Sequence, residues 1–113
     1  MSLKESKCEA CEIGAPLVTQ IEKTQFLNEI NDWQIKIIDD IEQLEKIYMF
    51  KSYPIALKFV EAIANMAENE GHHPKISLEW GKVQVNWWSH KIKGLHKNDF
   101  ICSAKTDSIF KDF

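Results

Sequence analysis

The segment from residue 76 to residue 87 constrains the fold most strongly, because it has the pattern of a β-hairpin. Apolar residues alternate with polar ones in residues 76–80 and again in residues 83–87, and Gly81-Lys82 separates the two runs. Alternation with a period of two indicates strands with one buried face, and a short turn with glycine joins antiparallel strands. The chain must therefore contain a sheet with a core on one of its faces.

A second hairpin is predicted nearer the N-terminus. Apolar and polar residues alternate in residues 33–37, and Asp39-Asp40 supplies a turn. A second strand is then expected from about residue 44 to residue 51, which is rich in aliphatic and aromatic residues. Because the connection is so short, these two strands must also pair in antiparallel fashion.

Three helices are expected around these hairpins, over residues 19–31, 54–69 and 97–110. The first begins with a capping box, since Thr19 and Glu22 can each satisfy a backbone donor of the first turn. The element order is therefore αββαββα. This order predicts an α+β fold, in which a four-stranded antiparallel sheet has its helices packed on one face.

The length and charge of the chain limit its functional class. With 113 residues it has room for one core but not for two, so residues 1–18 are interpreted as a flexible N-terminal lead segment and residues 19–113 as a single domain. The formal charge of −3 argues against a surface built to hold nucleic acid. No apolar run approaches the roughly 18–20 residues that span a membrane, and no secretory signal is apparent. A cytoplasmic protein is expected.

The three cysteines favour no particular chemistry. Cys8 and Cys11 form a C-x-x-C pair in the lead segment, whereas Cys102 lies in the apolar pattern of the last helix. Zinc sites commonly use two such pairs, and a redox pair is expected beside a βαβ unit. The pair is interpreted as reduced or occasionally oxidised thiols, with adventitious metal binding and a true redox or metal role as alternatives. Cys102 is interpreted as a buried small hydrophobe.

The residues most suited to chemistry form a spaced array in the second half of the chain. In order, the array consists of Glu68, His72-His73-Pro74, Trp80, His90 and Asp99. Gly71 is expected to end the second helix, which places the adjacent histidines in a loop. An imidazole has an ordinary pKa of about 6.5, so it can both give and take protons near neutrality. Three imidazoles with an aromatic ring and a carboxylate are suited to hold a flat heterocycle and move protons on it.

In the order, types and gaps of its members, this array resembles the signature of the pterin-4a-carbinolamine dehydratases. The resemblance extends over residues 19–113. It implies dehydration of 4a-hydroxytetrahydropterin, the spent cofactor of aromatic amino acid hydroxylases, to quinonoid dihydropterin. It also implies that no metal or organic cofactor is needed, because the pterin is the substrate.

The resemblance also implies roles for the members of the array. His72 and His90 are expected to be the acid/base pair, and His73 is expected to act in catalysis mainly by binding the substrate. Asp99 is expected to orient or charge a neighbouring histidine. The other members are expected to help bind the substrate: Glu68, Pro74 and Trp80.

Structural interpretations of the same residues are open as well. The loop histidines suit a solvated turn, Asp99 suits the first turn of a helix because of the helix dipole, and Glu68 suits a solvated helix face. Trp80 and Trp87 are expected to face the core or to line part of the cleft. His96 stands where the family more often has threonine, and it is expected to cap the last helix less well.

Two other functions compete with the dehydratase. The histidines and carboxylates are of types that zinc or iron accepts, but they lack an i, i+4 helical pair, so no metal is expected. Relatives also act as dimerisation cofactors of a homeodomain transcription factor or as assembly factors. We expect a homodimer or homotetramer, because association hides apolar surface that a small domain leaves uncovered. No membrane or direct nucleic-acid partner is expected, and an aromatic amino acid hydroxylase would act in the same pathway.

Overall fold

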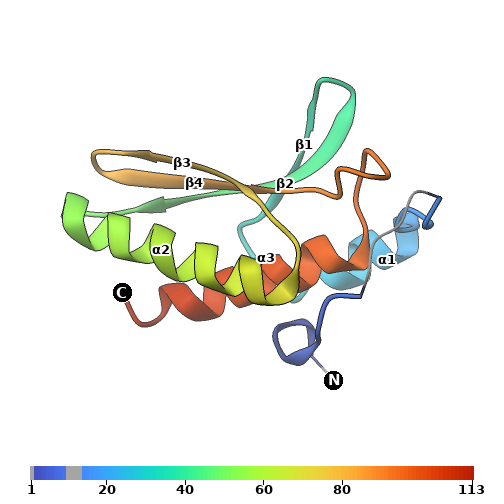
Figure 1. Cartoon of the computed structure of the whole chain (residues 1–113). Coiled ribbons are helices and arrows are strands. Elements are labelled where there is room, and N and C mark those ends of the chain that lie inside the picture. Colours follow the sequence, from blue (N-terminus) through green and yellow to red (C-terminus); the bar gives the residue numbers. More distant parts are fainter. Residues whose placement is uncertain (1, 10–13) are drawn as a thin grey trace.

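The computed structural model describes residues 2–9 and 14–113, and it shows a sheet with helices on one face (Figure 1). Along the chain the elements are η1 (Leu3–Glu5), α1 (Gln20–Leu27), β1 (Gln34–Ile38), β2 (Ile41–Met49), α2 (Tyr53–Glu70), β3 (Lys75–Glu79), β4 (Lys82–Trp87) and α3 (Lys97–Phe110). After η1, this is the predicted order αββαββα. No described helix combines the length and the apolar character that crossing a membrane requires.

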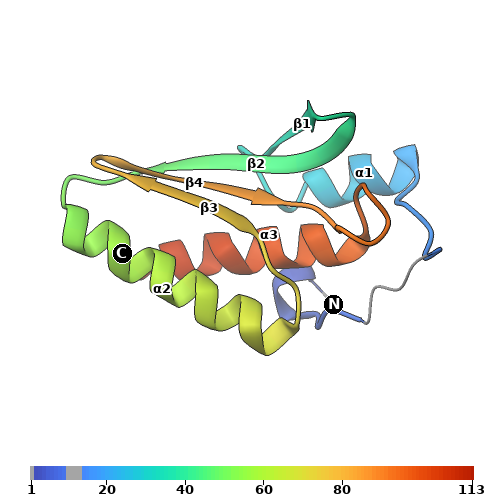
Figure 2. The same cartoon turned by 45° about the horizontal axis from the view of Figure 1, so that its top comes forward.

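The sheet has the strand order β1-β2-β4-β3, and all its pairs are antiparallel. The two hairpins therefore lie side by side, joined through the pairing of β2 with β4. Helices α2 and α3 run beneath the sheet, and the view in Figure 2 shows both of them on the same face. The predicted α+β class, with helices on one face of a four-stranded antiparallel sheet, is confirmed.

The core lies between the sheet and helices α2 and α3. Alternate strand residues point toward the helices because successive side chains of a strand point to opposite faces. The most deeply buried large side chains from the two layers are Leu44, Tyr48, Val83, Val85 and Trp87 of the sheet with Phe59, Ile63, Phe100 and Ile101 of the helices. The indole Nε1–H of Trp87 donates to Thr106 Oγ1 at 3.2 Å, so this buried polar group is satisfied.

The first helix is shorter than predicted. Its capping box is present, with Thr19 Oγ1 accepting from the Glu22 N–H, but α1 ends at Leu27 and not near residue 31. The chain then turns, and Asp32 takes a positive φ of 72°. Ile30 is buried in this turn rather than on a helix, because the segment leads directly into the sheet.

Trp80 does not face the core, contrary to the expectation from its alternation with Leu78. It follows the end of β3 at the turn of the second hairpin, beyond the last paired residues Glu79 and Lys82. There the indole is 73% exposed. Trp87, near the other end of the same hairpin, is buried as expected.

The start of the chain packs against α3, a contact that the sequence pattern did not indicate. Leu3 of η1 is only 2% exposed and belongs to the core. The Nζ of Lys105 on α3 donates to the backbone carbonyl of Lys4 at 3.0 Å. Residues 2–9 therefore lie along the helix that carries Asp99.

Candidate functional site

His72 is positioned by the end of α2. Gly71 ends this helix in the left-handed conformation, with φ 66°, as its place in the sequence predicts. The His72 N–H then donates to the carbonyl of Ala67 at 3.2 Å, which turns the chain back toward β3. The imidazole is 9% exposed and stacks on Trp87, with ring centroids 5.5 Å apart and an interplanar angle of 15°.

Asp99 is the centre of a buried hydrogen-bond network. Its carboxylate is fully buried in the first turn of α3, and Oδ1 lies 2.6 Å from His72 Nε2. Oδ2 accepts from Ser89 Oγ at 2.8 Å and from the backbone N–H of His96 at 2.9 Å. The loop after α2, the loop after β4 and the start of α3 therefore meet at one carboxylate.

His96 caps α3 with its own side chain. Its Nδ1 accepts from the N–H of Asn98 at 3.0 Å, while its backbone N–H donates to Asp99. These two bonds form a capping box in which an imidazole takes the place of the usual hydroxyl. Asp99 thus stabilises the helix start and holds His72 at the same time, so its structural and functional interpretations both fit the geometry.

His73 points to a different partner. Its Nε2 lies 2.8 Å from Glu68 Oε1, and the two side chains are 64% and 79% exposed. Pro74 follows, partly buried, and leads into β3. The two adjacent histidines thus differ in environment: His72 is enclosed and bonded to Asp99, whereas His73 and Glu68 form an ion-pair geometry open to solvent.

His90 lies in the loop after β4, next in sequence to Ser89. It is exposed, and its ring centroid lies 4.3 Å from that of the partly buried Trp88. Ser89 pairs with Gly94 across this loop in a small antiparallel bridge. Because Ser89 bonds the same carboxylate as His72, the loop that carries His90 is tied to the His72–Asp99 pair.

Trp80 lies apart from the other members of the array. His72 precedes β3 and Trp80 follows it, so the five residues of that strand, about 16 Å in length, separate them. Within this chain the indole does not lie with the histidines. Its role in substrate binding was inferred from its place in the array, and the spatial arrangement within the chain does not support it.

Two residues of the network were not identified as site residues from the sequence. No pattern marks Ser89 except its position between a strand end and His90. Trp87 was expected in the core or cleft, but its stacking on His72 was not foreseen. Contacts of this kind depend on the register of β3 against β4, where Lys75 pairs with Asn86.

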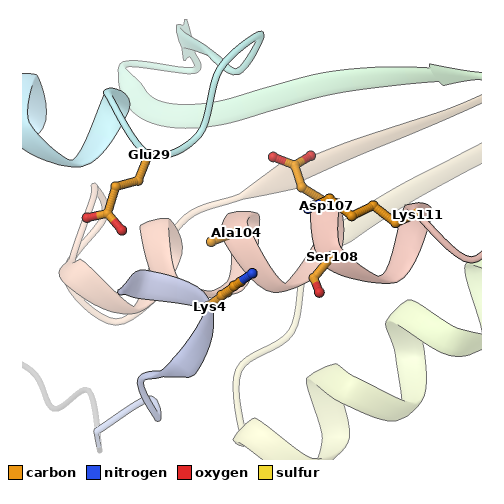
Figure 3. Close-up of a pocket in the computed structure, with 6 residues that line it drawn as sticks. All are labelled: Lys4, Glu29, Ala104, Asp107, Ser108 and Lys111. Atoms are coloured by element: carbon orange, nitrogen blue, oxygen red, sulfur yellow. The ribbon is translucent and has the colours of Figure 1, made fainter. Parts of the chain in front are cut away.

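A pocket of about 260 Å³ lies beside the second half of α3, near the start of the chain, and Figure 3 shows the residues that line it. Asp107 lines it and also accepts from Trp33 Nε1, from Lys46 Nζ and from the hydroxyl of Tyr48. Burial raises the pKa of Tyr48 well above its usual value, and the hydrogen bond to the Asp107 carboxylate raises it further. This cluster joins the sheet to α3 and is separate from the histidines.

The chemistry available at the histidine site is proton transfer. An imidazole whose Nε2 is fixed by a buried carboxylate keeps one orientation and presents its other nitrogen, Nδ1, for reaction. The exposed rings of His73 and His90 add two further groups that can donate or accept hydrogen bonds. Within residues 2–9 and 14–113, no three His, Cys, Asp or Glu side chains are grouped in a way that could hold a metal ion.

Comparison with known proteins agrees with the array. The sequence model of the pterin 4 alpha carbinolamine dehydratase family matches residues 16–109. The fold is similar to that of a transcriptional coactivator/pterin dehydratase from Brucella melitensis, with a TM-score of 0.75 and 26% identity over 83% of this chain and 98% of that one. A pterin dehydratase-like protein identified as a RuBisCO assembly factor in the alpha-carboxysome has a TM-score of 0.59 and 22% identity, over 72% of this chain and 92% of that one. The second likeness shows the fold alone.

Proposed function

The chain belongs to the pterin 4 alpha carbinolamine dehydratase family, and we propose that it dehydrates 4a-hydroxytetrahydropterin to quinonoid dihydropterin. The observation that carries the proposal is the buried hydrogen bond of 2.6 Å between His72 and Asp99, in a network that also includes Ser89 and His96. A carboxylate buried in this way needs a reason, because burying a charge without partners is costly. Orienting a reactive imidazole is such a reason.

The reaction needs two proton transfers. The 4a-hydroxyl accepts a proton and leaves as water, while a ring nitrogen of the pterin gives up its proton. We assign His72 and His90 to these two steps, one as acid and the other as base, so that the protein neither gains nor loses a proton over a turnover. The two imidazoles have then exchanged protonation states, and proton exchange with water restores them. Positioned acid–base groups accelerate such steps by about 10²–10⁴-fold. Only protein side chains act on the substrate in this scheme.

His73 and Glu68 are assigned to substrate binding. Both are exposed and polar, and their mutual hydrogen bond of 2.8 Å places donor and acceptor groups beside the loop that carries His72. A pterin ring presents alternating donors and acceptors along its edge. Pro74 is assigned to shaping this loop, because its fixed φ restricts the backbone of the residue before it.

The proposal is tested by stopped-flow measurement of freshly made 4a-carbinolamine. The protein should accelerate its conversion over buffer, and His72→Ala or His90→Ala should each lower turnover at least tenfold while the circular dichroism of the fold is retained. Asn65→Ala, on an exposed position of α2, is the matched control and should react at the wild-type rate. Wild-type turnover in both histidine variants would reject the assignment.

A protein-interaction or assembly role is the second candidate, and an exposed apolar surface favours it. Tyr53 and Leu57, one turn apart at the start of α2, lie on the same side of the helix and are 44% and 43% exposed. Exposed apolar patches mark contact surfaces. The same surface fits a homodimer or homotetramer. Light scattering after size exclusion measures the oligomer. A protein that forms a stable complex with a partner but does not convert carbinolamine would have this second function instead of the first.

A further inference from the structure

Two cysteines far apart in sequence meet where the start of the chain crosses α3. The Sγ atoms of Cys8 and Cys102 lie 3.3 Å apart, although 94 positions separate them. Cys102 is fully buried in α3, as its apolar pattern predicts, whereas Cys8 is partly exposed. A thiol that solvent can reach therefore touches one that solvent cannot.

The backbone around Cys8 is fastened to both helices near the His72–Asp99 pair. The Cys8 N–H donates to Glu70 Oε1 at 2.8 Å, close to the end of α2. The Glu9 N–H donates to Asn98 Oδ1 at 3.0 Å, and Asn98 Nδ2 donates back to the Glu9 carbonyl at 2.7 Å. Asn98 is fully enclosed and directly precedes Asp99. These hydrogen bonds fix the backbone around Cys8 and so hold its side chain against Cys102.

We propose that Cys8 and Cys102 form an oxidation site, at which a hydroperoxide converts the two thiols to a disulfide. In the first step the Cys8 sulfur attacks the peroxide: an S–O bond forms, the O–O bond breaks, and the Cys8 sulfenic acid and one water (or alcohol) result. In the second step the Cys102 sulfur displaces the sulfenic hydroxyl, which leaves as water with the Cys102 proton. The peroxide is reduced by two electrons and the two thiols are oxidised by two.

Exposure decides the order of the two steps. A peroxide can reach Cys8 from solvent, but it cannot reach Cys102 without opening the core. The hydrogen bond with Cys8 and burial both raise the pKa of the Cys102 thiol, so Cys102 is protected as a thiol until its neighbour has been oxidised. Closing the contact from 3.3 Å to a disulfide length requires a movement of about 1.3 Å. Cys8 is partly exposed and only packs against the edge of the core, so a movement of its side chain displaces few buried side chains.

The disulfide would join this segment covalently to α3, the helix that carries Asp99, beside the end of α2. It would close a loop of nearly the whole domain, which restricts the unfolded chain strongly. The thermal midpoint of the oxidised protein should therefore exceed that of the reduced protein by about 10 °C. Oxidation would join residues 2–9 covalently to the second turn of α3, where Cys102 lies, in addition to the hydrogen bonds that Asn98 makes with Glu9 in the first turn.

The test uses the full chain, reduced and then treated with equimolar hydrogen peroxide under non-reducing conditions. Peptide mapping by mass spectrometry should find a Cys8–Cys102 linked peptide that disappears on addition of dithiothreitol. Cys11, which lies outside the described residues, is the competing thiol. A Cys8–Cys11 disulfide, an intermolecular disulfide, or Cys8 sulfinic acid beside an unmodified Cys102 would each overturn the proposal.

A second measurement does not depend on altering the buried cysteine. The Cys11→Ser variant is the matched background, and its thermal midpoint is measured before and after the same treatment. The proposal expects the midpoint to rise and the rise to reverse with reductant. In Cys8→Ser, where the partly exposed thiol is removed, peroxide should leave the midpoint unchanged. If peroxide does not raise the thermal midpoint of Cys11→Ser, or raises that of Cys8→Ser equally, the proposed disulfide is contradicted.

Discussion

Replacing Asp99 by asparagine should separate the charge of this residue from its shape. The amide has one oxygen where the carboxylate has two, and the surroundings present three donors or ring nitrogens: His72, Ser89 and His96. In the wild-type protein, the backbone N–H of His96 and the hydroxyl of Ser89 both donate to the Asp99 carboxylate, and the N–H can do nothing else. The amide oxygen should therefore face these two, which leaves the NH₂ group facing His72 Nε2.

The loss of stability in Asp99→Asn follows from the three hydrogen bonds whose acceptor or partner is no longer charged. A hydrogen bond to a charged group contributes about 1.5–3 kcal/mol and a neutral one about 0.5–1.5 kcal/mol, so each of the three bonds weakens by about 1 kcal/mol. We therefore expect Asp99→Asn to lower the free energy of unfolding by about 2–4 kcal/mol, a large part of the about 5–15 kcal/mol typical of a domain. Ser89→Ala removes one of the three bonds to the carboxylate altogether and should cost about 1.5–3 kcal/mol.

Urea titration at neutral pH measures these differences in the free energy of unfolding. The second consequence is a change in which ring nitrogen of His72 carries the proton, and ¹⁵N–¹H NMR of the imidazoles measures it. Facing an NH₂ group, Nε2 of His72 has to accept, so the ring should carry its proton on Nδ1. Turnover of carbinolamine should fall at least tenfold, because Nδ1 is the nitrogen assigned to the substrate. Asp112→Asn, an exposed carboxylate just after α3, is the control and should change stability by less than about 0.5 kcal/mol. An Asp99→Asn protein as stable as the wild type would refute this reasoning.

Other predictions concern residues outside the histidine site. Because the pKa of Tyr48 is raised in the folded state, its stabilising contribution is complete below the ordinary tyrosine pKa of about 10 and is lost as pH rises above it. The free energy of unfolding of Tyr48→Phe should therefore fall less steeply than that of the wild type between about pH 10 and 12. An unchanged slope would count against the burial argument. Gly71→Ala should lower the free energy of unfolding, measured by urea titration, by about 1 kcal/mol. The loss comes from the left-handed backbone alone, since nothing lies within 4 Å of an added Cβ. Gly71→Asn should lose less, and equal losses in the two variants would contradict this. Trp80→Ala should change stability by no more than about 0.5 kcal/mol, because the indole is 73% exposed, and a larger loss would show that it packs against something.

The elements that were predicted well have local signals at their ends. Helix α3 has the predicted bounds, and α2 differs from its prediction by one residue at each end, because Gly71 and the residues before each helix mark these points. The predicted end of the first helix near residue 31 was wrong, because α1 ends at Leu27 and Ile30 is buried in the turn that follows it. His96 does cap α3, because its Nδ1 accepts from the N–H of Asn98; that it caps less well than threonine stays a prediction.

The site could be predicted as a set of residues but not as a set of contacts. Spacing and residue types identify His72 and Asp99, and the resemblance predicts that Asp99 orients a neighbouring histidine. That His72 is this histidine depends on how the loops at the ends of α2 and β4 meet α3, a long-range property of packing. The Cys8–Cys102 contact has the same character, because no local pattern relates residues 94 positions apart.

The central claim is that the imidazoles of His72, His73 and His90 share one pterin site, and imidazole NMR with a stable dihydropterin tests it most directly. Titration of the protein with this product-like ligand should shift the ring ¹⁵N signals of all three histidines along a single saturation curve. The signals of His96, whose Nδ1 is engaged in capping α3, should move least. Unmoved signals of His72 and His90 at saturating ligand, or shifts confined to His96, would contradict the claim.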